Sequence, residues 1–148
     1  MSKNFLLGIG HPLRSDDGAG SFIAQHFKDK DWITADGKSA PENFTSVIKK
    51  SRPELLVIVD SVEMNLSPGD IRIIPLEKIV SLYLSTHYLS LSYLIEYLSP
   101  YCREIILIGI EPLSIEMGEK ISEPVLEACY LVMDLLKSKQ FNNIPVLL

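Results

Sequence analysis

The chain has 148 residues, 47% of them hydrophobic and 22% charged, which is enough apolar material to bury the core of a single domain spanning residues 1–148. Its net charge is −5, and no cluster of basic residues is longer than Lys49-Lys50, so a nucleic-acid or anionic-membrane partner is disfavoured. The start of the chain runs directly into an apolar segment without a signal peptide, and no apolar run approaches the roughly 20 residues of a membrane span. We therefore expect a cytoplasmic protein, and a monomer.

Hydrophobic patterning predicts strands and helices that alternate along the chain. A short apolar strand over Phe5–Gly10 is followed by a helix from about Asp17, whose apolar residues share one face. A second strand covers Trp32–Ala35. Pro41 then opens another helix, which Pro53 prevents from continuing.

The apolar pattern in the middle of the chain predicts the central strand of a sheet. Leu55–Val59 is an uninterrupted apolar run that ends at Asp60, as is typical of a strand buried on both faces. The next strand, Ile71–Ile74, follows a turn at Ser67–Asp70. This connection is shorter than the dozen or so residues that a parallel crossover needs, so we expect the strand to be antiparallel.

The last third of the chain adds a helix that begins near His87, a buried strand over Ile105–Ile110 and a final helix capped by Ser122. The elements together predict an α/β fold, in the form of a three-layer α/β/α sandwich. Its five-stranded mixed sheet has helices on both faces and an antiparallel fourth strand.

Polar residues follow the predicted strands at the sheet edge where α/β proteins bind their ligands. Five carboxylates and one imidazole belong to this set: Asp16, Asp17, Asp36, Asp60, Glu111 and His87. Two carboxylates and one imidazole with open coordination positions describe a site for a divalent ion such as Ni²⁺ or Zn²⁺. Two plainer interpretations stay open, in which Asp60 only holds a neighbouring loop and His87 is an ordinary helix residue.

The loop after the first strand starts with G-x-G, like a dinucleotide-binding turn. Leu13 then takes the position of the third glycine, and Asp16 and Asp17 lie where a phosphate group would bind. An acidic pair repels a pyrophosphate and attracts a cation. One residue of the pair can cap the following helix while the other faces the crevice.

The two cysteines form neither a C-x-x-C pair nor a zinc knuckle. Cys129 lies on the apolar stripe of the last helix and is predicted to be a buried structural thiol. Cys102, beside Arg103, is the one conceivable nucleophile, and we disfavour that role.

Several motifs lie in register with one family over residues 4 to about 130. They are Gly8-x-Gly10…Asp16-Asp17-Gly18-x-Gly20, Asp36-Gly37…Ser39-Ala40-Pro41-Glu42-Asn43, Val59-Asp60, Leu66-Ser67-Pro68-Gly69-Asp70-Ile71-Arg72-Ile73-Ile74, Thr86-His87 and Leu107-Ile108-Gly109-Ile110-x-Pro112. With these motifs the chain resembles the hydrogenase maturation endopeptidases of nickel-iron hydrogenases. The Ser39–Asn43 and Pro68–Ile74 segments are most similar to the branch that serves hydrogenases of the formate-hydrogenlyase type.

The resemblance implies a phosphorylase/hydrolase-like fold and a specific reaction. Such an enzyme removes a short C-terminal extension from the hydrogenase large-subunit precursor after nickel has been inserted. By the same resemblance, Asp17, Asp60 and His87 are the metal ligands, which leaves Asp16 as the residue expected to cap the helix. The nickel is supplied by the precursor, and zinc or cadmium binds there only adventitiously. Asp16, Asp36 and Glu111 are candidates for a general base, and we group Asp36 with the three ligands as catalytic.

Two residues depart from the family pattern. His11 stands where the family usually has Asn, and Lys38 where it has a second Gly. His11 either adds a metal ligand or replaces the hydrogen bonds of the Asn, and Lys38 either adopts an ordinary backbone conformation or accepts strain. We favour the replacement for His11 and the ordinary conformation for Lys38. The rival interpretations are a non-catalytic nickel chaperone with the same ligands and a flavodoxin-like or Rossmann-like nucleotide-binding module.

Overall fold

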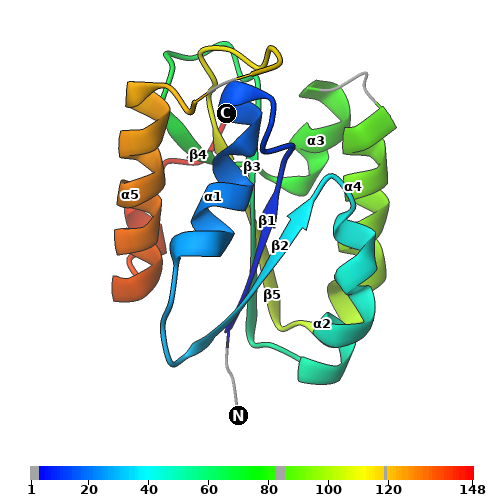
Figure 1. Cartoon of the computed structure of the whole chain (residues 1–148). Coiled ribbons are helices and arrows are strands. Elements are labelled where there is room, and N and C mark those ends of the chain that lie inside the picture. The colour runs from blue at the N-terminus through cyan, green and yellow to red at the C-terminus, as the bar shows by residue number, and fades with distance from the viewer. Residues whose placement is uncertain (1–3, 83–85, 119) are drawn as a thin grey trace.

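The computed structural model describes the backbone of residues 4–82, 86–118 and 120–148, and the side chains of these residues except 80–90. A five-stranded sheet forms its middle layer, with the strand order β2-β1-β3-β5-β4 (Figure 1). The strands are β1 (Asn4–Ile9), β2 (Trp32–Lys38), β3 (Leu55–Ser61), β4 (Ile71–Ile73) and β5 (Glu104–Ile110).

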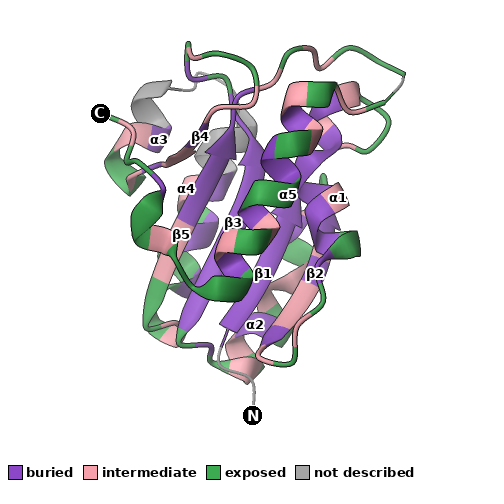
Figure 2. Ribbon diagram, turned by 90° about the vertical axis from the view of Figure 1, so that its left-hand side faces the viewer, coloured by how far each residue is buried: buried purple, intermediate pink, exposed green. Residues whose placement is uncertain are grey.

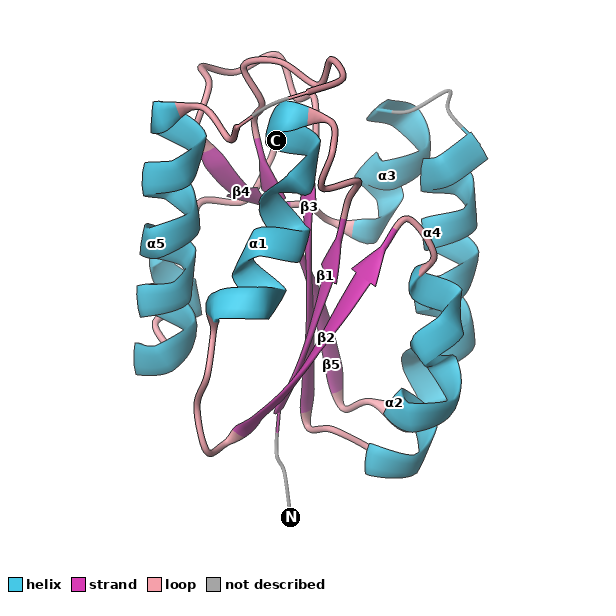
Figure 3. Cartoon of the chain, viewed as in Figure 1, coloured by secondary structure: helices cyan, strands magenta, loops and turns pink. Residues whose placement is uncertain are grey.

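Helices cover both faces of this sheet, as Figure 3 shows. The α-helices are α1 (Ala19–His26), α2 (Thr45–Ser51), α3 (Leu76–Leu82), α4 (Thr86–Leu98) and α5 (Glu123–Ser138). Short 3₁₀ turns are η1 (Ser15–Gly18), η2 (Pro41–Phe44), η3 (Ser99–Tyr101) and η4 (Phe141–Asn143). Within the described ranges, none of these helices has the length and apolar character needed to cross a bilayer.

The predicted sandwich and its mixed sheet are confirmed. β1 pairs in parallel with β2 and β3, and β3 pairs in parallel with β5. β4 pairs antiparallel with β5, with Ile71 opposite Ile110. The short connection after β3 leaves no room for a crossover helix, so the chain turns back along the far side of β5.

Alternation along the strands divides the core into two layers, one on each face of the sheet. Figure 2 shows β1 and β3 buried along their length between the helices. On β3, Leu56 and Ile58 face the layer formed with α2, α3 and α4, whereas Val57 and Val59 face α1 and α5. Successive side chains of a strand point to opposite faces, so Asp60 lies on the α2–α4 side. On β2, the same rule places Asp36 on the side of Trp32, which packs with α1 and α5.

Helix α1 starts two residues later than predicted, because the acidic pair itself forms the 3₁₀ turn η1, which precedes the helix. The first turn of α1 lies very close to the sheet. A Cβ atom at Gly20 would collide with the carbonyl oxygens of Ile9 and Val59. Glycine therefore permits the close approach that sets η1 beside the ends of β1 and β3.

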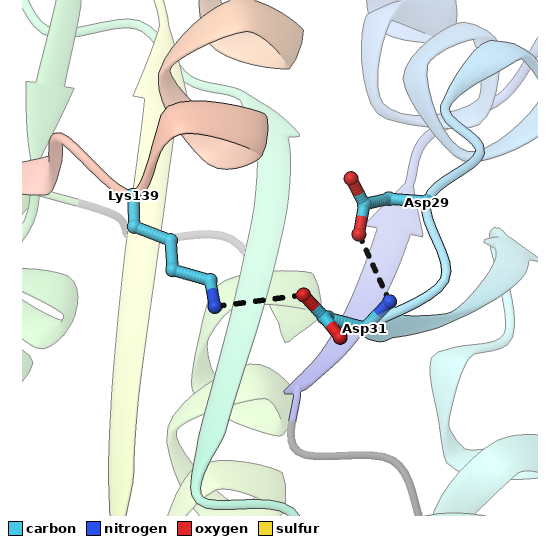
Figure 4. A network of polar contacts seen from close by, with 3 residues as sticks. All are labelled: Asp29, Asp31 and Lys139. Carbon is cyan, nitrogen blue, oxygen red and sulfur yellow. Dashed lines mark hydrogen bonds and ion pairs between the residues drawn. The ribbon is translucent and has the colours of Figure 1, made fainter.

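At the opposite end of the sheet, the end of α5 is tied to the start of β2 (Figure 4). Lys139 Nζ lies 3.7 Å from Asp31 Oδ2, and the Asp31 amide donates to Asp29 Oδ1 at 2.9 Å. The two charged side chains are 53% and 41% exposed. Water screens such a pair, so its contribution to stability is about 1 kcal/mol or less.

Candidate functional site

Asp17 lies in η1, in the loop that follows β1. Its side chain is half-buried, and its Oδ2 accepts the backbone N–H of His11 at 3.0 Å. The Nδ1 of His11 in turn accepts the N–H of Leu13 at 3.1 Å. This contact with the residue two positions ahead is the one that an Asn side chain makes in turns, so the expected role of His11 is supported.

Asp60 is the next-to-last residue of β3. It is 1% exposed, and its Oδ1 accepts the N–H of Ser61 at 2.8 Å. Because η1 packs against β3, the structure brings the elements of Asp17 and Asp60 together at the carboxyl edge of the sheet. Asp17 follows β1 and Asp60 lies near the end of β3, so the two residues reach this edge from different strands.

His87 lies in the first turn of α4, at the end of that helix nearest the same sheet edge (Figure 1). Its side chain lies outside the described residues. Among the side chains that the structure does describe, no three His, Cys, Asp or Glu residues form a metal-binding group. The set of Asp17, Asp60 and His87 therefore stays a prediction.

Asp36 is held between β2 and α1. Its Oδ2 accepts the Ser21 hydroxyl and the Gln25 amide, both at 2.9 Å, and its Oδ1 accepts the Lys38 N–H at 3.2 Å. The residue is only half-buried, which leaves part of it open to solvent. Ser21 and Gln25 were not predicted as partners. The signal for them is a polar pair one turn apart within an otherwise apolar helix.

Asp16 has a different role from the one expected. It is 0% exposed and does not cap a helix, since η1 and α1 receive no side-chain cap from the described residues. Its carboxylate instead accepts four hydrogen bonds from the loop after β5, given by Leu113 N (2.8 Å), Ser114 N (3.3 Å), Ser122 N (2.6 Å) and Ser122 Oγ (2.8 Å). The prediction of an Asp16 cap was wrong, because these distant donors outcompete the local ones.

Ser122 occupies the N-cap position of α5, as predicted, but its hydroxyl donates to Asp16. Ser122 therefore makes no capping hydrogen bond to α5, and the prediction that it caps this helix was wrong.

Glu111, directly after β5, is also buried and hydrogen-bonded. It is 7% exposed, and its Oε1 accepts the backbone N–H groups of Met64 and Leu66 at 2.7 and 3.1 Å. The carbonyl oxygen of Glu111 accepts the N–H of Gly69, and the N–H of Glu111 donates to the carbonyl oxygen of Asp70. Of the three candidates for a general base, Asp16 and Glu111 are therefore buried acceptors of loop hydrogen bonds, and Asp36 retains solvent exposure.

Lys38 contradicts the expectation of an ordinary backbone. Its φ is +49°, in the left-handed region, and its carbonyl accepts the Gly10 N–H at 2.7 Å. The cause is a bulge, because the pairing of β1 with β2 shifts from Gly8–Asp36 to Ile9–Lys38. A side chain in this conformation costs about 1 kcal/mol.

Both thiols are unsuited to nucleophilic catalysis. Cys129 is fully buried, and burial, with a smaller effect of the Asp16 charge, raises the pKa of its thiol to about 12. Burial also raises the pKa of Cys102 to about 11. Since the thiolate is the nucleophilic form, each sulfur is protonated and unreactive near neutral pH. The prediction of a buried structural Cys129 is confirmed.

Comparison with known proteins gives one consistent result. A family model described as hydrogenase maturation protease matches residues 20–139. The Hydrogenase 3 maturation protease of Escherichia coli strain K12 is 36% identical over 142 residues, or 93% of this chain and 91% of that protein. A crystal structure of a Hydrogenase 3 maturation protease has a TM-score of 0.90 at 34% identity, covering 99% of this chain and 97% of the other. A solution structure of an endopeptidase from Escherichia coli has a TM-score of 0.90 at 33% identity, with the same coverage.

Proposed function

The chain belongs to the hydrogenase maturation protease family, and from this premise we propose that its substrate is the large-subunit precursor of a nickel-iron hydrogenase. In this proposal it removes the C-terminal extension of the precursor after nickel has been inserted. Membership of the family makes it an endopeptidase, and neither a nucleotide-binding module nor a non-catalytic chaperone is favoured.

The observation that carries the proposal is the position of Asp17. It is a half-buried carboxylate on a turn that packs against the end of β3, where Asp60 lies. The first turn of α4, which carries His87, is near the same edge. Carboxylates and imidazole are ligands that Ni²⁺ accepts. The three residues would complete the coordination of nickel that arrives with the precursor, so that the enzyme recognises whether the metal is present.

Within this proposal the metal belongs to the substrate. Bound at the site, it would polarise the scissile carbonyl or lower the pKa of an attacking water. Asp36 is our choice for the general base, because it alone of the three candidates is half-exposed. Zinc or cadmium is expected to bind the same ligands adventitiously. A monomeric state and a cytoplasmic location complete the proposal, and size-exclusion chromatography and cell fractionation test them.

The decisive experiment compares two forms of one precursor. Purified protein is incubated with precursor loaded with nickel and with precursor that carries iron alone, and mass spectrometry detects the released C-terminal peptide. We expect release only from the nickel-loaded form. Equal release from both forms would remove nickel recognition while keeping the protease. Release from neither form, with nickel still bound, would overturn the proposed substrate.

A further inference from the structure

Two loops at the carboxyl edge of the sheet are joined into one unit. The first is the loop of residues 11–18 after β1. The second, the 113–122 loop after β5, is described at residues 113–118 and 120–122. Main-chain hydrogen bonds link Asp16 N to Ser114 O (3.0 Å), Ser15 N to Gly118 O (3.1 Å) and Gly118 N to Leu13 O (2.9 Å). Two side chains add to them, since Arg14 Nε donates to Ile115 O and Ser15 Oγ donates to Glu116 O.

Asp16 is the buried centre of this junction. Both of its carboxylate oxygens are used, Oδ1 by Ser122 N and Oδ2 by Leu113 N, Ser114 N and Ser122 Oγ. The side-chain contacts of Arg14 and Ser15 are exposed, whereas Asp16 has no exposed surface. A charged acceptor makes stronger hydrogen bonds when it is buried than when it is exposed.

The turn that carries Asp17 depends on this junction. η1 has four residues, and a single 3₁₀ turn has little stability of its own. No side chain that the structure describes caps it. Its orientation is set by the Asp17–His11 contact on one side and by Asp16 on the other. Small displacements of a reacting group reduce catalysis strongly, so what holds η1 matters for the reaction.

We propose that Asp16 is a positioning residue for the cleavage reaction, one that locks the 113–122 loop onto the 11–18 loop and thereby fixes the Asp17 carboxylate. This inference rests on the proposed function, because Asp17 is a ligand only in that proposal. It assigns a role to the 113–122 loop as well, as the support of the site on the β5 side.

The test is Asp16→Asn, which keeps the size of the side chain but turns one acceptor oxygen into an NH₂ group that faces N–H donors. Ser122→Ala is the milder variant, since it removes one of the four donors. Leu136→Ala is the control, because Leu136 is fully buried in α5 outside both loops. It measures what general destabilisation does to the rate.

Two measurements are made well below the melting temperature of each variant. For Asp16→Asn, we expect kcat for nickel-loaded precursor to fall at least about tenfold, with KM changed little. For Ser122→Ala, we expect a smaller decrease in kcat. Amide hydrogen exchange of Leu113, Ser114 and Ser122 should become faster in both variants. In Leu136→Ala, kcat and the exchange of these amides should match the wild type.

A folded Asp16→Asn with wild-type kcat and wild-type exchange would overturn the inference, and so would a loss of kcat no larger than in Leu136→Ala. If Asp16→Asn does not fold, Ser122→Ala decides in the same way. If the wild-type protein cuts no precursor, the proposed function fails. The positioning role of Asp16 is then tested by hydrogen exchange and by titration with Cd²⁺. Unchanged exchange and unchanged cadmium affinity in Asp16→Asn would then overturn it.

Discussion

Two regions of the sheet edge use the same chemical group in opposite ways. On the β5 side, the carboxylates of Asp16 and Glu111 are buried and accept backbone N–H groups from neighbouring loops. On the β1 and β2 side, those of Asp17 and Asp36 are half-exposed. Backbone donors from neighbouring loops make the buried carboxylates of Asp16 and Glu111 part of the structure, whereas partial exposure leaves those of Asp17 and Asp36 accessible to a ligand.

The largest loss of cleavage is expected from substitution of the three proposed metal ligands. Asp17→Ala, Asp60→Ala and His87→Ala should each abolish processing of nickel-loaded precursor, because each removes one ligand of the proposed site. The circular dichroism spectrum of each variant should remain that of the wild type. Wild-type-like cleavage by any two of the three, measured as released peptide, would refute the ligand assignment.

Asp36→Asn should have the next largest effect. Loss of the proposed base is expected to lower kcat by about 10²–10⁴-fold, measured in single-turnover cleavage with unchanged precursor binding. Ser21→Ala is the matched control, since it removes the hydrogen bond that the Ser21 hydroxyl donates to Asp36 Oδ2 but keeps the Asp36 carboxylate. A similar loss in both variants would show that Asp36 acts only by holding α1 to β2.

Glu111→Ala should instead reduce stability. It leaves the N–H groups of Met64 and Leu66 without their acceptor, at about 1–3 kcal/mol for each unsatisfied group. Urea unfolding measures this loss, and cleavage at low temperature should persist. Glu111→Gln keeps an acceptor oxygen and should lose less. If Glu111→Ala were as stable as the wild type but inactive, the two regions would not differ as we describe.

The smallest effect is expected at the bulge beside Asp36. Lys38→Gly should raise the free energy of unfolding by about 1 kcal/mol, because glycine adopts a φ of +49° without steric cost. Lys38→Ala keeps a Cβ atom and should give no comparable gain. Thermal unfolding of the two variants side by side measures the difference. An equal stability of Gly and Ala here would mean that the left-handed backbone is not strained.

Much of the site's placement follows from local features of the sequence. The glycine-rich loop, the run ending at Asp60 and the helix opening near His87 each predict which element carries a polar residue to the carboxyl edge. Local features do not predict that Asp16 is buried in the fold while Asp17 is left half-exposed. Adjacent residues of one type have the same local signal, so a capping role for Asp16 was the natural but wrong expectation.

By itself, the sequence determined the alternating elements, the central position of β3 and the antiparallel β4, because periodicity and connection length are local properties of the chain. Only the tertiary structure decided which carboxylates are buried as acceptors of hydrogen bonds from distant loops. The donors to Asp16 are 97 to 106 residues away in the chain. The left-handed Lys38 likewise follows from the pairing of β2 with β1. Such contacts depend on segments that meet only after the sheet has formed, and no local pattern encodes them.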